Sequence, residues 1–585
     1  MRFLSNVLAV IVGLLIFWVI GFFILAGVVA VSSGESKVQT AENSLLHLNL
    51  DNVIIVEQGI DDELELPAFA GFASVPTVGL NQLKQAIQTA KADDNIKGIY
   101  LQAGNVSSGQ SMLSEIRAAL EDFRSSGKFI VAYSEVMAES GYYLSSVADE
   151  VYLNPLGAME FNGLSSEMVF MKGLFEKIEI EPVIFRVGEF KSAVEAFTLD
   201  KMSEENRLQT ESYLKDLNDH FLAHIAESRS IGVERLGEIN SQMLVRDIKD
   251  AVDLGLIDGL WYDDQVKDLL RDKLGLNEDD DIASINIANI NKTAKSKNRL
   301  SKNRIAVIVA NGEIVSGNAD GVISSDKFLA EVRKARKDKD IKAIVLRVNS
   351  PGGSILASEV IWRELSEAQK EKPLIASMSD VAASGGYYIS APADTIVAHP
   401  NTITGSIGIF GLWFNAQGLL NNKLGITTDV AKTGEFSDFM TPTRPLSGPE
   451  QSVIQKQVED GYDTFISRVA EGRNMSKEAV LEIASGRVWS GLQAKDRGLV
   501  DVLGGLDDAI QIAAAKAGVQ DDYRVLYYPE QKTMLERFLA ELSQDVQSRY
   551  MRLKLGSAYF IYQQLEKAKQ YEGIMVRLPY DVHIH

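Results

Sequence analysis

Ser406 has the surroundings of an accessible nucleophile. It stands in Thr404-Gly-Ser-Ile-Gly408, where small neighbours would expose its hydroxyl and let a peptide approach. The glycines do not have the Gly-x-Ser-x-Gly spacing, so the strained elbow that this spacing forms is not predicted. A serine hydroxyl is a weak nucleophile and needs an adjacent base. The remaining sequence must therefore supply that base.

Histidine is the usual base, but the six histidines of the chain are poorly suited to the task. His399 precedes Ser406 by seven residues and is one candidate. His220 and His224 share a helix face, yet no HExxH glutamate or third ligand accompanies them, so no metal site is predicted. Lysine can replace histidine, because burial in apolar surroundings lowers the pKa of its amine. Lys191, in a compact segment, is the candidate.

A glycine pair could stabilise the negative charge that forms on a substrate carbonyl. Gly352 and Gly353 lie in Asn349-Ser-Pro-Gly-Gly-Ser354, between a predicted strand and a predicted helix. Backbone N–H groups there could form an oxyanion hole. The alternative interpretation is an ordinary tight turn with a capping serine.

The candidate residues occupy two copies of one domain. Residues 95–102 resemble 340–347, and 134–144 resemble 379–389, both at an offset of 245. The copies are complementary in chemistry, because Phe161 stands in the place of Ser406, and Ser437 in the place of Lys191. We therefore expect one composite site that uses both copies. The predicted segments are 1–35 (anchor), 36–290 (first repeat), 291–304 (basic linker), 305–526 (second repeat) and 527–585 (C-terminal extension).

Each repeat alternates short apolar runs with helical periodicity. In the second repeat, strands are expected at 304–309, 341–348 and 373–377, and helices at 325–338 and 354–369. This alternation predicts an α/β fold with a largely parallel sheet. Ligands of such sheets bind beyond the carboxyl ends of the strands.

The N-terminus predicts a membrane anchor. Residues 7–31 are apolar and without charge, long enough to cross a bilayer of about 30 Å. Arg2 precedes them, which favours a cytoplasmic N-terminus and a body on the outer side. Removal as a signal peptide, after Ala30-Val-Ser32, is the alternative. The net charge of −21 argues against nucleic-acid binding, and the absence of cysteine excludes thiolate chemistry.

Taken together, the motifs resemble the protease IV (signal peptide peptidase A) family in its long, duplicated form. They are Val187–Glu195, Asn349–Ser354, Ser384-Gly-Gly-Tyr-Tyr388 and Thr404–Gly408. The resemblance implies tandem caseinolytic-protease/crotonase-like repeats (a ββα superhelix) after one transmembrane helix. It also implies a Ser406–Lys191 dyad without cofactor or metal, with Gly352 and Gly353 as oxyanion donors.

The same resemblance implies a homotetramer at the periplasmic face of the bacterial inner membrane, which degrades signal peptide remnants and other short apolar peptides. A further hydroxyl should orient the lysine, and Thr428 is the candidate. Two alternatives remain at this point. One is a crotonase-like acyl-CoA enzyme, since fold alone does not decide function. The other is a non-catalytic membrane scaffold.

Overall fold

The computed structural model describes residues 12–14, 16, 17, 20, 39–59, 76–294, 301–530 and 573–578. Of the predicted membrane span 7–31, therefore, only a few residues are described, and these are helical. Within these ranges no helix is long and apolar enough to cross a bilayer. The amphipathic segments expected at 534–542 and 560–568 lie outside the described residues.

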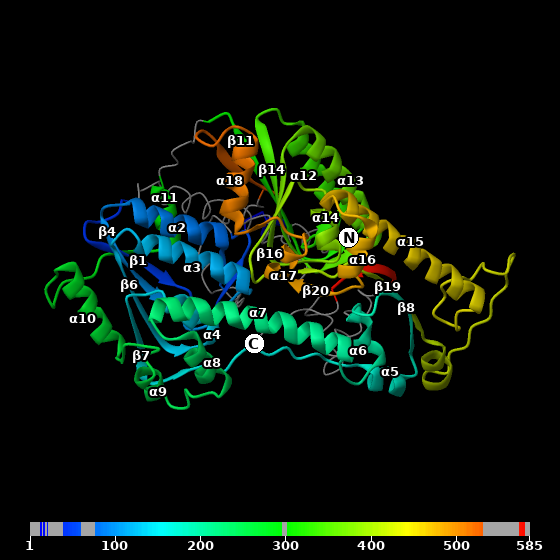
Figure 1. Cartoon of the computed structure of the whole chain (residues 1–585), viewed down its shortest axis with the longest axis horizontal. Coiled ribbons are helices and arrows are strands. Elements are labelled where there is room, and N and C mark those ends of the chain that lie inside the picture. The colour runs from blue at the N-terminus through cyan, green and yellow to red at the C-terminus, as the bar shows by residue number, and fades with distance from the viewer. Residues whose placement is uncertain are drawn as a thin grey trace.

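The first repeat forms a parallel six-stranded sheet in the order β10-β1-β4-β6-β7-β9, with a small second sheet, β3-β2-β5. In Figure 1 the strands β1, β4, β6 and β7 of its main sheet lie in the left half. Its elements are β1 (Ser44–Asn49), β2 (Val53–Val56), β3 (Thr77–Gly79), α2 (Leu80–Ala92), β4 (Ile96–Gln102), β5 (Val106–Ser107), α3 (Gln110–Arg124), β6 (Phe129–Met137), α4 (Glu139–Ser145), β7 (Glu150–Met159), α5 (Lys172–Ile178), β8 (Glu181–Val187), a 3₁₀ turn (Ser192–Val194), α6 (Glu195–Thr198), α7 (Glu204–Arg229), α8 (Val233–Ser241), α9 (Ile248–Asp253), β9 (Gly259–Leu260), α10 (Asp263–Leu274), β10 (Ser284–Ile285) and α11 (Ile287–Thr293).

The second repeat is built on the sheet β20-β18-β16-β14-β11-β22, from which β17 and β21 branch. Its elements are β11 (Arg304–Asn311), β12 (Ile314–Val315), β13 (Ile323–Ser324), α12 (Ser325–Lys337), β14 (Ile341–Ser350), β15 (Gly352–Ser354), α13 (Ile355–Glu371), β16 (Leu374–Ala383), α14 (Gly385–Ser390), β17 (Thr395–Ala398), β18 (Ile403–Gly405), β19 (Ile409–Asn415), a π-helical turn (Leu419–Lys423), α15 (Gly448–Arg473), α16 (Lys477–Ile483), β20 (Val488–Ser490), α17 (Gly491–Asp496), β21 (Val502–Leu503), α18 (Leu506–Lys516), β22 (Arg524–Tyr528) and β23 (Gly573–Arg577).

The two repeats follow the same order of elements. In each, two successive units place a strand in the main sheet, one or two short strands in a second sheet and then a helix; β4-β5-α3 and β14-β15-α13 are one matching pair. The second sheet of the second repeat has the order β13-β12-β15-β23-β19-β8. The mixed α/β fold is thus confirmed, as are the strands and helices expected in the second repeat. Their central strands are buried along nearly their whole length, as strands covered on both faces should be.

Three expectations need correction. The segment 291–304 is not linker throughout, because α11 continues to Thr293 and β11 begins at Arg304. The second repeat does not end at 526, since β22 pairs with β11 as far as Tyr528. Residues 352–354 are not a bare turn but the short strand β15, which pairs with β12 and β23.

A buried ion cluster joins the repeats. Arg347 of β14 is fully buried and donates hydrogen bonds to Glu57 (2.9 Å) and Glu115 (2.8 Å) of the first repeat. Asp380 of β16 accepts hydrogen bonds from the first backbone N–H groups of α3, at Ser111 (2.8 Å) and Met112 (3.1 Å). Charges buried without partners would be costly, so this cluster fixes how the repeats meet. The long helix α7 also runs across both halves (Figure 1) and contacts β20.

Candidate active site

Strand β8 carries the lysine of the first repeat into the second. It pairs antiparallel with β19, with Val187 opposite Ile409, and Phe185 packs in the core of the second repeat. Lys191 follows the end of β8 and Ser406 precedes the start of β19. Lys191 is four positions after Val187 and Ser406 is three positions before Ile409, so both lie beyond the same end of the antiparallel pair. The strand pairing thus brings the two candidate residues together.

Lys191 and Ser406 are in direct contact. Lys191 Nζ lies 3.0 Å from Ser406 Oγ, 3.1 Å from the Ser406 carbonyl oxygen and 2.8 Å from Ser384 Oγ. All three residues have no exposed surface. Burial, with no compensating carboxylate, holds the pKa of the Lys191 amine well below its ordinary value of 10.5. Burial therefore favours the neutral amine, which is the form that can accept a proton.

Two glycines make room for the lysine side chain. A Cβ added to Gly486 would lie 2.7 Å from Lys191 Cβ, and one added to Gly408 would lie 3.2 Å from Lys191 Cδ. Gly486 also has a φ of +79°, which side-chain-bearing residues rarely adopt. The sequence indicated Gly408 as a small neighbour of Ser406, whereas Gly486 was missed because it lies far along the chain.

Both serines at the site have left-handed backbone conformations. Ser406 has φ +51° and Ser384 has φ +56°, positions that are uncommon outside glycine. Surrounding backbone hydrogen bonds hold them there: Ser406 N–H donates to the Arg487 carbonyl (2.7 Å) and Ser384 N–H to the Gly405 carbonyl (2.8 Å). Residues with unusual backbone angles persist only where the surrounding structure holds them in place, and they are frequent at catalytic positions.

The hydroxyl that contacts the lysine belongs to Ser384, not Thr428. Thr428 is exposed in an irregular segment after β19, so the expectation for it is corrected. Ser384 opens the Ser384-Gly-Gly-Tyr-Tyr388 motif, at the carboxyl end of β16. The motif was visible in the sequence, but the strand before it was expected to end at residue 377, and the direction of the Ser384 side chain depends on its unusual backbone angles.

The glycine pair adjoins the same site. Gly352 lies against Gly385, the residue after Ser384: a Cβ on Gly352 would be 2.6 Å from the Gly385 nitrogen. Gly352 and Gly353 have φ of +98° and +157° and are buried on β15. The Gly352 N–H donates to Ser350 Oγ (3.2 Å). Their service as oxyanion donors remains a prediction.

The histidines considered from the sequence lie away from the dyad. His220 and His224 of α7 have ring centroids 4.1 Å apart, and His399 lies 5.3 Å from His220. Burial lowers the pKa of His220 and His224 to about 4 and that of His399 to about 3. Over the described ranges, no group of three or more acidic, histidine or cysteine side chains is placed to hold a metal.

A polar network fixes the turn that follows Lys191. Ser192 Oγ donates to Asn206 Oδ1 (3.0 Å), and Gln209 Nε2 donates to Ser192 Oγ (2.9 Å). Asn206 Nδ2 in turn donates to Glu195 Oε2 (3.0 Å). All four side chains are buried. This network was not predicted from the sequence, because its members become neighbours only when α7 folds back over the turn.

The site combines a serine with left-handed backbone angles, a buried lysine amine whose pKa is lowered, and a second hydroxyl, with the glycine strand β15 alongside. The model of Peptidase family S49 matches the chain twice, at residues 122–277 and 366–520. Two proteins named Protease 4, from Salmonella typhi and Haemophilus influenzae, are each 34% identical to it, with 90% and 86% of this chain and 87% and 85% of their own length covered. The "Putative signal peptide peptidase SppA" of Enterococcus faecium is 41% identical, covering 35% of this chain and 61% of its own.

The chain belongs to Peptidase family S49, the protease IV/SppA group, and is a serine peptidase. The twofold match of the family model confirms the duplication expected from the sequence. The family match also favours a peptidase over the crotonase-like acyl-CoA enzyme that was the alternative.

Proposed function

We propose that Ser406 is the nucleophile and Lys191 the general base of an endopeptidase that degrades signal peptide remnants and other short apolar peptides. The observation that carries this proposal is the 3.0 Å contact between Lys191 Nζ and Ser406 Oγ, with the amine fully buried. Nucleophile and base must lie within hydrogen-bonding reach before proton transfer is possible.

The surroundings of the amine suit its neutral form. A neutral amine has two N–H groups and one lone pair. Its N–H groups can donate to Ser384 Oγ (2.8 Å) and to the Ser406 carbonyl (3.1 Å), which leaves the lone pair for the Ser406 hydroxyl proton. Ser384 therefore has the role of a positioning residue, because it directs the lone pair at the nucleophile.

The mechanism follows from these roles. Lys191 takes the proton from Ser406 Oγ as that oxygen attacks the substrate carbonyl, and the ammonium then gives the proton to the departing amine. A water molecule, deprotonated by Lys191 in the same way, releases the acyl group from Ser406. Backbone N–H groups beside Gly352 and Gly353 would stabilise the oxyanion.

A fluorophosphonate probe tests the assignment. The full chain in detergent should be labelled on Ser406, as mapped by mass spectrometry, and the variants Ser406→Ala and Lys191→Met should lose both labelling and peptide hydrolysis. Far-UV circular dichroism establishes whether the variants are folded. Full hydrolysis by a folded Lys191→Met variant would refute the proposal.

We also infer that residues 7–31 anchor the enzyme with its body on the periplasmic side of the inner membrane. The uncharged apolar run supports the anchor. The name of the Enterococcus faecium relative, "Putative signal peptide peptidase SppA", supports the substrate class. Deletion of residues 1–35 should release the chain from the membrane fraction.

A synthetic signal peptide should be cut faster than a polar peptide of equal length, and equal rates would contradict the substrate class.

Each repeat, we infer, has the caseinolytic-protease/crotonase-like fold. The unit that both repeats share supports this assignment: a strand in the main sheet, then a short strand in the second sheet, then a helix. An experimental structure that showed a different order of layers would exclude it.

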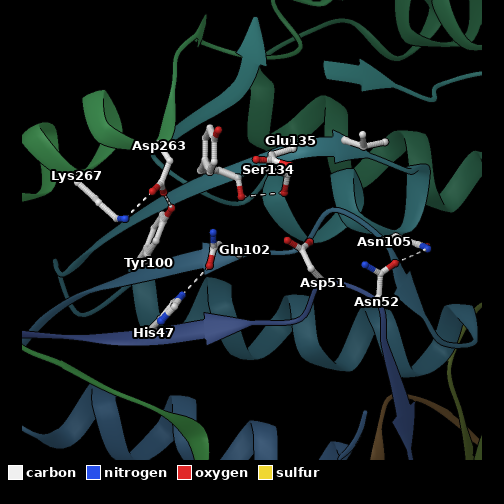
Figure 2. A pocket seen from close by; sticks show the side chains of 12 residues that line it. His47, Asp51, Asn52, Tyr100, Gln102, Asn105, Ser134, Glu135, Asp263 and Lys267 are labelled. Atoms are coloured by element: carbon white, nitrogen blue, oxygen red, sulfur yellow. Dashed lines mark hydrogen bonds and ion pairs between the residues drawn. The ribbon is translucent and has the colours of Figure 1, made fainter. Parts of the chain in front are cut away.

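The expected homotetramer has support from the way the repeats meet within one chain. Arg347 and Asp380 of the second repeat bond to the first repeat, and Ser379 bonds to Arg347. At the offset of 245, their counterparts are Gln102, Ser134 and Glu135. In the first repeat these line an open pocket of about 620 Å³. Figure 2 shows them at the ends of neighbouring strands, together with Asp51 and Tyr100.

The face that would dock on this pocket is also open. Within one chain, Asp380 binds the N-terminus of α3; the counterpart of α3 is α13, whose Leu356 is 65% exposed and Val360 38% exposed. We propose that α13 of one copy docks on Glu135 and Val136 of the next. Glu135→Lys and Leu356→Asp should each reduce the mass of the assembly in native mass spectrometry, and unchanged mass in both would contradict this arrangement.

A further inference from the structure

The last described strand of the chain lies beside the active site. β23 (Gly573–Arg577) runs antiparallel between β15, the glycine strand, and β19, the strand that follows Ser406. Val576 faces Gly353 on one side, and Met575 faces Phe410 on the other. Figure 1 shows β23 in red next to β19, although it comes from the far end of the sequence.

This strand occupies a place in which a peptide can bind. Without β23, the facing edges of β15 and β19 would have no strand between them. An extended peptide added to such edges gains backbone hydrogen bonds, with side-chain pockets providing selectivity. β23 makes these contacts from both sides and is deeply buried: Val576 has no exposed surface and Arg577 has 5%.

The residue after β23 fills an apolar pocket at the dyad. Leu578 is 1% exposed, and its N–H donates to the Pro351 carbonyl (2.6 Å), beside the glycine pair. Its pocket is formed by buried apolar side chains from both repeats: Tyr213, Leu217, Ala383, Ile403 and Val488. Ala383 directly precedes Ser384, and Ile403 lies three residues before Ser406. A peptide side chain in this pocket is therefore held close to the nucleophile.

We propose that residues 573–578 occupy the peptide-binding channel of Ser406, so that the chain inhibits itself until a substrate displaces this strand. The proposal rests on the function proposed above and names the subsite: the Leu578 pocket would take a leucine-sized apolar residue of the substrate. A tethered occupant acts at an effective concentration of the order of millimolar, so weak strand pairing suffices to compete with free peptides. Complete burial of Lys191 and Ser406 with β23 in place agrees with a closed channel.

An ion pair allows the strand to be loosened without changing the pocket. Arg577 Nη1 lies 2.6 Å from Glu313 Oε1, on the segment before β12. Arg577→Glu places two carboxylates there and should weaken docking, while the double variant Arg577→Glu/Glu313→Arg should restore it. Arg235→Glu is the matched control, because Arg235 is 50% exposed and its partner Glu238 lies on the surface of α8.

The experiment compares these full-length chains. We expect Arg577→Glu and Leu578→Asp to raise the rate of fluorophosphonate labelling at Ser406, and kcat/KM for an apolar peptide, about tenfold or more. The control and the double variant should match the natural chain. The free peptide Gly-Ile-Met-Val-Arg-Leu should then inhibit Leu578→Asp competitively.

The outcomes separate the two proposals. If Ser406 is labelled at the same rate in the natural chain and both loosened variants, self-inhibition is wrong while the dyad stands. If Ser406 is labelled in none of the chains, the proposed function itself fails. A loss of labelling in folded Arg577→Glu would show that β23 supports the site, and would also overturn self-inhibition.

Discussion

The Gln209 side chain accepts a hydrogen bond from the Val488 N–H, 3.1 Å away, and so joins α7 to the segment behind Ser406. Through its Nε2 group, the same side chain donates to Ser192, the neighbour of Lys191. The Gln209 side-chain amide thus bonds both to the turn that follows Lys191 and to the start of β20, and so fixes the distance between these two segments. Gln209→Met keeps the volume but loses both hydrogen bonds, and we expect kcat to fall ten- to hundredfold, with KM nearly unchanged. Steady-state kinetics test this, and a change confined to KM would contradict a positioning role.

The pH dependence of activity should report the Lys191 amine. The proton acceptor must be neutral, and burial lowers its pKa below 10.5, so kcat/KM should rise with pH and level off well below 10.5. Acidification protonates Lys191 and removes activity. A rate profile with its midpoint at the ordinary lysine value would show that the amine is not desolvated in solution.

Ser384 should contribute through the lysine rather than through the substrate. Ser384→Ala removes the 2.8 Å contact to Lys191 Nζ, so the lone pair is no longer directed at Ser406. We expect kcat to fall by roughly 10²-fold, at the lower end of general-base effects, and the midpoint of the pH profile to shift. Ser384→Thr keeps a hydroxyl and should recover part of the rate. Equal activity of Ser384→Ala and the natural chain would exclude this role.

Arg347 should control stability. Arg347→Met leaves Glu57 as a buried carboxylate without its cation, while Glu115 keeps only its pair with Lys84 (2.7 Å); breaking comparable buried pairs costs about 3–5 kcal/mol. Urea denaturation should show this loss in the free energy of unfolding. Arg333→Met is the control: the Arg333 side chain is 53% exposed, so its pair with Glu364 should be worth less than about 1 kcal/mol.

The three buried histidines should make the chain sensitive to acid. Their pKa values in the folded chain, about 4, 4 and 3, are below the ordinary 6.5. Between pH 6.5 and 4 the unfolded chain therefore binds more protons, and stability falls as the pH falls. Urea midpoints at pH 7, 6 and 5 measure this. His399→Asn, which places the residue of the first repeat (Asn154) in the second, should flatten the dependence.

The sequence by itself determined the local elements and the candidates. Apolar runs and helical spacing placed β11, α12, β14 and α13 within a few residues, because these patterns reflect burial on one face or two. The reciprocal absence of Lys191 and Ser406 from the two copies predicted a composite site. The structure brings the two into contact, because β8 of the first repeat pairs with β19 of the second.

Only the tertiary structure decided how that site is built. Ser384 took the place expected for Thr428, because the backbone angles that direct its hydroxyl are set by hydrogen bonds from distant segments. Gly486 and Gln209 act on Lys191 across more distant parts of the chain, and β23 reaches the site from the other end. Such contacts depend on which surfaces the folded repeats bring together, and no periodicity or spacing in the sequence encodes them.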